Sequence, residues 1–158
     1  MSERYDKILP FIFEVHKNQF DKGGSPYVLH PIAVALMCDS ESEKVVALLH
    51  DVIEDSNYTL EDLRSRFPLS LTEQRALKVL TRDKSMSYRD YIRRIAFYPL
   101  AIKVKKADLL HNMDLTRLQS VSQKDQERNK KYKKAYDYLC SMEVFYGAIV
   151  RWKDQDNI

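Results

Sequence analysis

The chain has 158 residues, of which 44% are hydrophobic and 31% are charged, and its formal net charge is +3. This length and composition predict one compact domain with its own core, spanning residues 1–158. The positive excess is compatible with anionic small-molecule ligands, but it is too weak to indicate binding to nucleic acid. We therefore expect no nucleic-acid partner.

The sequence also argues against a membrane partner. No apolar run approaches the roughly 20 residues that a membrane-spanning helix needs. The first residues, MSERYDKILPFIFEVHK, do not have the pattern of a signal peptide. Cys38 and Cys140 lack the spacing of a metal-binding motif and are typical of a reducing compartment. We expect a cytoplasmic protein, and the sequence predicts no particular oligomeric state.

The first part of the chain predicts two helices separated by a loop. Only three glycines occur in the chain, which favours helices over a turn-rich β structure. Residues 5–19 have apolar side chains at helical spacing, with Pro10 expected near the first turn. Residues 20–30 predict a loop that contains two of the glycines. Pro31 then suits the first position of the next helix.

Capping residues mark most of the later helix starts. Ser40 or Ser42 can cap the helix that follows. Capping-box patterns occur at three further places, TLED from Thr59, SLTE from Ser70 and SYRD from Ser87. Another helix is expected to start at Pro99, and a long final helix over residues 123–150. The fold class predicted from these elements is all-α, in a single compact helical bundle.

The stretch VVALLHDVIED, residues 45–55, places four titratable side chains in an apolar helical run. Burying such groups is costly unless a metal, mutual hydrogen bonds or a water-lined cleft compensates. Residues four apart share a helix face, so His50 should pair with Glu54, and Asp51 with Asp55. The first residue of each pair is then a candidate metal ligand. The second is a candidate to orient or deprotonate an attacking water.

Two further residues are candidates to complete a metal site. His30 lies at the predicted junction of loop and helix, and Asp108 interrupts the apolar helix KKADLLHNMD. Two imidazoles and two carboxylates suit a divalent ion such as Mn²⁺ or Fe²⁺, which acidifies bound water and polarises phosphoryl oxygens. Taken singly, His30 is equally consistent with a hydrogen bond at a helix end, and Asp108 with an ion pair to Lys105. A metal site explains these polar interruptions together.

Three other residues in or just after this helix have simpler interpretations. His111, three residues after Asp108, fits either a position beside a metal ligand or packing elsewhere. Arg117 and Asp114 are expected to form an ion pair with each other along the helix.

Four segments resemble successive signatures of the HD-domain hydrolases of the RelA/SpoT type. They are HKNQFDKGGSPYVLHPIAVAL, ALLHDVIEDSNYTLEDL, LTRDK and KVKKADLLHNM, and they run in the family's order from about residue 16 to 113. The resemblance implies a compact α-helical HD domain. It also implies a small stand-alone hydrolase of the alarmone ppGpp, whose 3′-pyrophosphate is removed to return GDP.

The resemblance implies a role for each candidate residue. The implied ligands of Mn²⁺, with Fe²⁺ and Zn²⁺ as alternative ions, are His30, His50, Asp51 and Asp108. The implied catalytic residues, which position or activate water, are Glu54 and Asp55. The implied substrate-binding residues are Lys22, which approaches phosphate, and Asn112. The implied partner is therefore a phosphorylated nucleotide.

One position departs from the family's pattern. Many ppGpp hydrolases of this type have arginine at the second residue after the glutamine of this loop, where it contacts guanine, whereas this chain has Asp21. An anion there changes base recognition and repels phosphate, so the alternative function is hydrolysis of another phosphorylated nucleotide or cofactor. A non-catalytic nucleotide-sensing module is a further alternative, which the complete set of candidate ligands disfavours. Because the long members place a synthetase after the HD domain and this sequence ends earlier, we expect degradation rather than synthesis of the alarmone.

Overall fold

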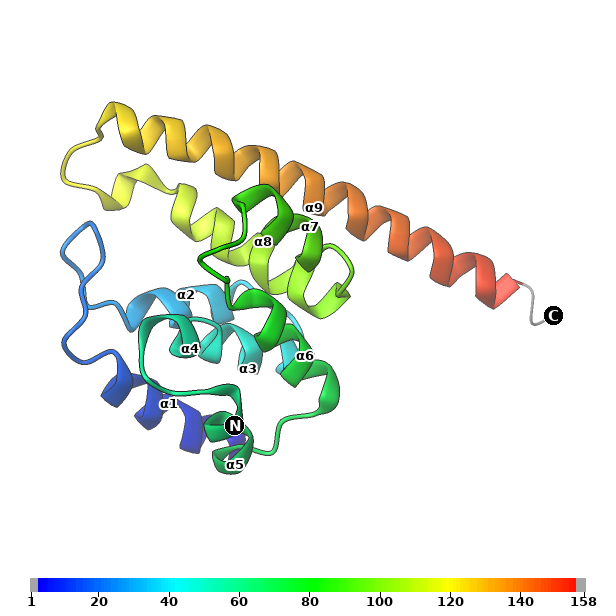
Figure 1. The fold of residues 1–158 in the computed structure, drawn as a ribbon, viewed down its shortest axis with the longest axis horizontal. Coiled ribbons are helices and arrows are strands. Elements are labelled where there is room, and N and C mark those ends of the chain that lie inside the picture. The colour runs from blue at the N-terminus through cyan, green and yellow to red at the C-terminus, as the bar shows by residue number, and fades with distance from the viewer. Residues whose placement is uncertain (1–2, 156–158) are drawn as a thin grey trace.

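The computed structural model describes residues 3–155, with side-chain burial described through Ile149 (Figure 1). Within this range the chain forms α-helices and one short 3₁₀ helix, η1, and no β-strand, which confirms the predicted all-α class. The elements in chain order are α1 (Glu3–Val15), α2 (Leu29–Leu36), α3 (Glu41–Leu49), α4 (Val52–Asp55), α5 (Leu60–Arg66), α6 (Leu71–Leu80), α7 (Tyr88–Ile95), α8 (Pro99–Met113), η1 (Leu115–Arg117) and α9 (Gln123–Gln155). None of the helices in this part of the chain combines the length and the apolar character that crossing a membrane requires.

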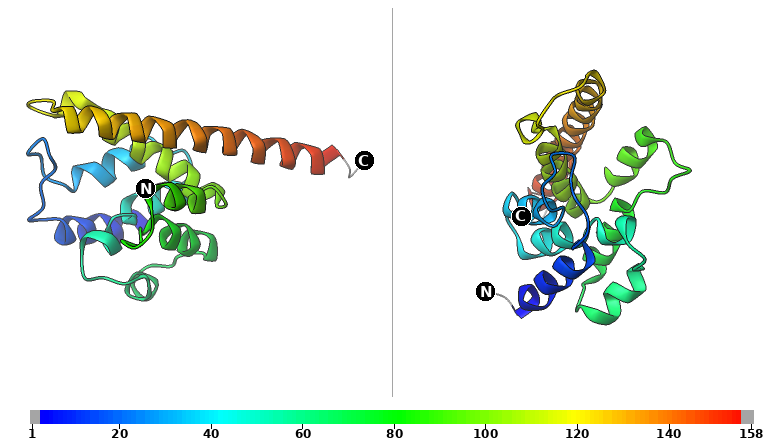
Figure 2. Two further views of the ribbon diagram at one scale, coloured as in Figure 1. Left: turned by 45° about the horizontal axis from the view of Figure 1, so that its top comes forward. Right: turned by 90° about the vertical axis from the view of Figure 1, so that its left-hand side faces the viewer.

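Helix α8 is central to the packing of the bundle. It contacts α2, α3 and α6 on one side and α9 on the other, while α1 packs on α3 (Figures 1 and 2). Leu49 of α3, Leu77 of α6 and Leu109 of α8 are almost completely buried between these helices. Each such side chain stabilises the fold by about 1.5–3 kcal/mol relative to an exposed one. The helices that carry the candidate ligands therefore pack on one another in the core.

Most helix starts lie where the capping residues predict them. Ser40 caps α3 through the Glu43 N–H, and Ser87 caps α7. Thr59 and Ser70 form complete capping boxes at the starts of α5 and α6. These side chains satisfy N–H groups of the first turn that have no partner within the helix.

Two predictions about proline are wrong. Pro10 lies inside α1 rather than in its first turn. The hydrogen bond that its ring removes would have gone to the carbonyl of Asp6, and both residues lie on the exposed face, where water can replace it. Helix α2 starts at Leu29, so Pro31 is its third residue rather than its first. Proline is tolerated there because the first N–H groups of a helix have no intrahelical partner.

The prediction of one continuous helix over residues 45–55 is also wrong. Helix α3 ends at Leu49, and α4 is a single turn that starts at Val52. His50 and Asp51 lie between the two helices with right-handed helical backbone angles. The junction therefore presents the histidine–aspartate doublet at a helix end instead of along an uninterrupted helix face.

Candidate metal centre and substrate pocket

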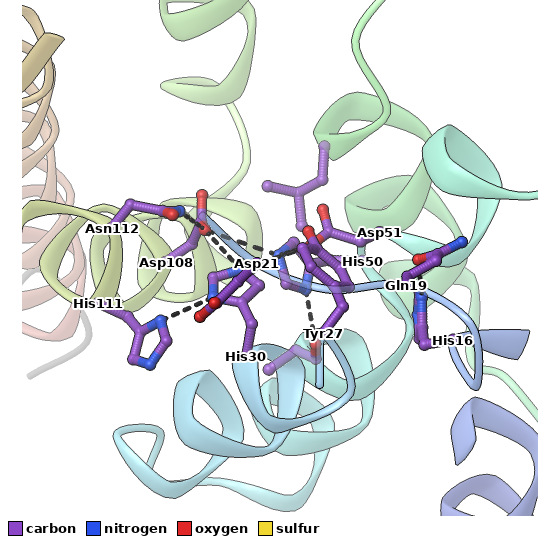
Figure 3. A network of polar contacts seen from close by, with 12 residues as sticks. His16, Gln19, Asp21, Tyr27, His30, His50, Asp51, Asp108, His111 and Asn112 are labelled. Atoms are coloured by element: carbon purple, nitrogen blue, oxygen red, sulfur yellow. Dashed lines mark hydrogen bonds and ion pairs between the residues drawn. The ribbon is translucent and has the colours of Figure 1, made fainter. Parts of the chain in front are cut away.

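The structure brings the four candidate ligands together from separate helices (Figure 3). His30 comes from α2, the doublet from the α3–α4 junction and Asp108 from α8. Nε2 of His30 lies 3.1 Å from Oδ1 of Asp108 and 3.4 Å from Oδ2 of Asp51. Nε2 of His50 lies 3.1 Å from the same Asp51 oxygen and 3.8 Å from the same Asp108 oxygen. Both imidazoles thus face the same two carboxylates.

This donor set fits a divalent metal ion. The ligand atoms of His30, His50 and Asp51 all lie within 4.8 Å of one another. Two atoms bound at right angles to one ion, each about 2.1 Å from it, are about 3 Å apart, close to the separations found here. Nε2 of His50 is buried and makes no hydrogen bond, which is costly unless a cation occupies the space it faces. The cluster can therefore hold a metal, and Asp108 is placed to contribute a fourth ligand.

The charges of the cluster also favour a cation. Burial by itself acts to raise the pKa of Asp51, but in the metal-free site the charge of His50 and the nearby imidazole of His30 lower it overall. Burial acts on Asp108 in the same direction, and the ammonium of Lys105 lowers its pKa well below the usual range. Nζ of Lys105 donates to Oδ2 of Asp108 at 2.7 Å. When both imidazoles are neutral, as metal ligation requires, two carboxylates against one ammonium leave one net negative charge in a buried site.

Neighbouring side chains fix the orientation of both carboxylates. The hydroxyl of Tyr27 donates to Oδ2 of Asp51 at 2.6 Å. Nδ2 of Asn112 donates to Oδ1 of Asp108, also at 2.6 Å. Asn112 therefore contacts a candidate ligand directly, in addition to lining the pocket described below. Sequence reasoning missed Tyr27, although its position one turn before His30 was a usable signal.

The two imidazoles have different hydrogen-bond partners on the side away from the carboxylates. Nδ1 of His50 donates to the backbone carbonyl of Ala47 at 2.6 Å. Nδ1 of His30 lies 2.7 Å from Nδ1 of His111, so His111 is beside a candidate ligand rather than packed elsewhere. Burial, and then the charges of His30 and Arg117, lower the pKa of His111 to about 4. His111 is therefore neutral at neutral pH.

Glu54 and Asp55 are solvent-accessible at the end of α4. Oε2 of Glu54 accepts a hydrogen bond from the N–H of Arg82, in the loop between α6 and α7, and not from His50 as expected. Partial burial and the charge of Asp51 raise the pKa of Asp55. A carboxyl group with a raised pKa is better matched to accepting a proton near neutral pH.

A pocket of about 400 Å³ opens beside the cluster. His30 and Asn112 form its inner wall, and the outer walls come from the glycine loop, the segment after α8 and the start of α9. Its cationic and aromatic lining residues are Lys22, Arg117, Arg128, Phe20, Tyr27 and Tyr132. Cations and ring faces are the groups that bind phosphates and bases, and the volume is typical of a small-molecule site. A larger groove of about 530 Å³ between α7 and α9 contains none of the candidate ligands.

Lys22 is the most exposed of the predicted binding residues. Its side chain is 68% exposed, and Nζ lies 3.6 Å from Oδ1 of Asp125 at the start of α9. Arg128 pairs with the same carboxylate at 2.8 Å. The two cations thus flank one aspartate at the mouth of the pocket.

Asp21 is engaged within the chain rather than free in the pocket. Its Oδ1 accepts hydrogen bonds from the N–H groups of Gly23 and Ser25, and its Oδ2 pairs with Arg117. The expected pair of Arg117 with Asp114 does not form, because α8 ends at Met113 and Asp114 caps η1 instead. The guanidinium group that Asp21 binds in the pocket is therefore that of Arg117, which comes from η1 and not from the glycine loop.

Comparisons with known proteins found relatives of this chain. No protein-family model matches the chain. A guanosine-3′,5′-bis(diphosphate) 3′-pyrophosphohydrolase of Haemophilus influenzae is 37% identical in an alignment 114 residues long that covers 63% of this chain and 17% of that protein. The zebrafish (Danio rerio) guanosine-3′,5′-bis(diphosphate) 3′-pyrophosphohydrolase MESH1 is 39% identical in an alignment 121 residues long that covers 68% of this chain and 66% of that protein. The bifunctional (p)ppGpp synthase/hydrolase SpoT of Escherichia coli is 33% identical in an alignment 114 residues long that covers 63% of this chain and 16% of that protein.

The chain spans less than a fifth of the long bacterial relatives and about two thirds of the short zebrafish one. The shared region is large enough to contain the helices that supply the candidate ligands. The helical fold, the convergence of the four side chains and these matches agree with one another. The chain belongs to the RelA/SpoT type of HD-domain proteins.

Proposed function

We propose that the chain is a metal-dependent phosphohydrolase that removes the 3′-pyrophosphate of ppGpp and returns GDP. The observation that carries this proposal is the convergence of two imidazoles and two carboxylates beside a pocket lined by cations and aromatic rings. The substrate is suggested by relatives that are named for this reaction.

The metal would be held by His30, His50, Asp51 and Asp108. Mn²⁺ is the ion that we propose, because a mixture of imidazole and carboxylate ligands suits it, and Fe²⁺ and Zn²⁺ are the competitors to test. A bound divalent ion lowers the pKa of a coordinated water and polarises a phosphoryl oxygen. Lys105 holds one oxygen of Asp108, which leaves the other directed at the imidazoles.

Glu54 and Asp55 receive the proton of the attacking water in this proposal. The water oxygen adds to the phosphorus that is attached to the 3′ oxygen. The bond between this phosphorus and the 3′ oxygen then breaks, and the 3′ oxygen leaves as a hydroxyl after taking up a proton. The raised pKa of Asp55 suits a group that first accepts a proton and then returns it. Lys22 and Arg128 offset the negative charge of the phosphates at the pocket mouth. Asn112 retains a second amide N–H that can donate to the substrate.

Asp21 does not by itself require a different substrate. Because both of its oxygens accept hydrogen bonds from within the chain, its charge is offset by Arg117 before it faces a ligand. Phe20 is 66% exposed and lines the same pocket as Tyr132, so two aromatic rings are available to contact a base. Such rings can stack on any base, and the names of the relatives make a guanine nucleotide the first substrate to test.

The test is a substrate panel with purified protein and Mn²⁺. We expect ppGpp to yield GDP and pyrophosphate, with turnover abolished by a chelator and lost in Asp51→Asn. Arg75→Met, on an exposed position of α6, is the matched control and should retain full activity. Turnover of a different nucleotide in place of ppGpp would overturn the substrate assignment. Binding of nucleotide and metal without turnover of any panel member would overturn the assignment as an enzyme.

A further inference from the structure

Four side chains form a continuous path from the glycine loop to the candidate ligand His30. Oδ2 of Asp21 pairs with one guanidinium nitrogen of Arg117. The other nitrogen donates to Nδ1 of His111 and to the carbonyl of His111, each at 2.9 Å. Nδ1 of His111 lies 2.7 Å from Nδ1 of His30. Figure 3 shows His111 and His30 facing each other at this contact, on the side of His30 away from the carboxylates.

The chemistry of arginine fixes the direction of these hydrogen bonds. A guanidinium group can only donate, so Nδ1 of His111 acts as an acceptor and has no proton. The contact between the two imidazoles then requires that Nδ1 of His30 is the donor. A neutral imidazole with its proton on Nδ1 has a free electron pair on Nε2. That nitrogen is the one that lies between Asp51 and Asp108.

We propose that Asp21, Arg117 and His111 are positioning residues that set the tautomer and the orientation of His30 for a divalent cation. This inference rests on the metal site of the proposed function. It assigns a role to the departure at residue 21, because an aspartate at that position anchors the arginine that fixes His111. The loop that borders the substrate pocket is thereby coupled to one ligand of the metal.

The backbone supports this role for the loop. A Cβ atom on Gly23 would lie only 2.3 Å from the carbonyl oxygen of Arg117, so the loop touches η1 at a point where no side chain fits. Asp21 and Gly23 therefore contact Arg117 on its side chain and on its backbone. The side chain of Arg117 is 26% exposed and that of Asp21 is 13% exposed, so this ion pair is screened by solvent less than a pair on the open surface.

The test measures Mn²⁺ affinity by calorimetry, independently of turnover. Groups that orient a metal ligand typically change metal affinity 10–100-fold when they are removed. We expect His111→Leu and Arg117→Met to weaken Mn²⁺ binding within that range. His111→Asn keeps an acceptor near the Nδ1 position and should stay within about threefold of the unmodified protein. Asp21→Asn, which keeps the loop contacts but removes the charge, should have an intermediate effect. Arg75→Met should have none.

A spectroscopic measurement excludes a purely structural explanation. In nitrogen NMR spectra of the metal-free protein, at a pH where its histidines are neutral, His30 should show its proton on Nδ1, and this preference should be lost in His111→Leu while the signals of His50 persist. Unchanged Mn²⁺ affinity and an unchanged His30 spectrum in His111→Leu and Arg117→Met would overturn this inference but not the proposed function. Failure of the unmodified protein to bind any divalent ion would overturn both this inference and the proposed function.

Discussion

His50 and His30 face the same pair of carboxylates, but different parts of the molecule hold them. His50 is fixed by the carbonyl of Ala47, three residues earlier in the same helix. His30 is fixed by His111, which is 81 residues later in the chain. The first arrangement follows from the backbone of one helix, whereas the second requires α2, the end of α8, η1 and the glycine loop to be assembled. The site therefore has one locally determined half and one half that depends on tertiary contacts.

Replacing one of the two carboxylates that both imidazoles face should have the largest effect. Asp108→Asn preserves the size of the side chain but removes the charge that a divalent ion needs. A metal contributes several kcal/mol to stabilising the developing charge, so we expect kcat to fall by about 10³-fold or more. Steady-state kinetics and Mn²⁺ calorimetry check this expectation. Activity within tenfold of the unmodified protein would exclude Asp108 from the metal site.

Removing the buried ammonium of Lys105 should show how much it stabilises the metal-free protein. The side chains of Lys105 and Asp108 are only 14% and 6% exposed. Lys105→Met leaves the carboxylate without its cation, and breaking a buried pair in this way costs about 3–5 kcal/mol. Urea denaturation should show this loss in metal-free protein, and added Mn²⁺ should recover more stability in the variant than in the unmodified chain.

The matched control for this variant lies two residues earlier on the same helix. Lys103 pairs with Glu143, and its side chain is 45% exposed. Lys103→Met should therefore change the free energy of unfolding by less than about 1 kcal/mol. Equal losses of stability in Lys105→Met and Lys103→Met would show that the buried pair of Lys105 with Asp108 stabilises the protein no more than an exposed pair does.

A change in the glycine loop should affect only the half of the site that depends on tertiary contacts. Gly23→Ala places a methyl group against the carbonyl of Arg117, and overpacking of this kind costs about 1–3 kcal/mol. If the loop shift reaches His30 through Arg117, Mn²⁺ affinity should fall by about tenfold. Gly24→Ala is the control, because Gly24 has a φ of +86° but no atoms within 4 Å of an added Cβ. It should cost stability through backbone strain while leaving Mn²⁺ affinity nearly unchanged.

The smallest effect on Mn²⁺ affinity is expected far from the site, where α1 is tied to α6. Arg4 donates two hydrogen bonds to the carboxylate of Glu73, whose side chain is 1% exposed. Burial acts to raise the pKa of Glu73, but the hydrogen bonds from Arg4 and from the Ser70 N–H lower it overall. Glu73→Gln should reduce the free energy of unfolding by about 1.5–3 kcal/mol at pH 7 and leave Mn²⁺ affinity unchanged.

The pH dependence of that effect has a definite sign. The folded pKa of Glu73 lies below its unfolded value, so the stabilisation is present above the unfolded pKa and is lost as the pH falls through the folded one. The difference between Glu73→Gln and the unmodified protein should therefore shrink in acid. A difference that stays constant down to strongly acidic pH would contradict the assignment of this stabilisation to the charged pair.

Local sequence patterns were sufficient for much of the fold. The helix starts at Ser40, Thr59 and Ser70 follow from capping side chains that act within one turn. The prolines were harder, because Pro10 and Pro31 are tolerated at more helical positions than the first. The break between α3 and α4 had no local signal, since VVALLHDVIED contains neither glycine nor proline.

The candidate site likewise has features that local sequence patterns reveal and features that only the assembled fold reveals. That His50, Asp51 and Asp108 interrupt apolar helices was visible in the sequence, because buried charge in such a run requires compensation. The pairing of Asp21 with Arg117 was not, because 96 residues separate them and only the assembled fold brings them together. The predicted pair of Arg117 with Asp114 assumed that α8 continued beyond its actual end at Met113.

The central claim is that side chains from α2, from the α3–α4 junction and from α8 bind one divalent ion. The most direct measurement is anomalous scattering at the manganese edge from a crystal grown with Mn²⁺. The account predicts a single strong peak within bonding distance of Nε2 of His30, Nε2 of His50 and the carboxylates of Asp51 and Asp108. A peak elsewhere, or these four side chains turned away from one another with no ion between them, would contradict it.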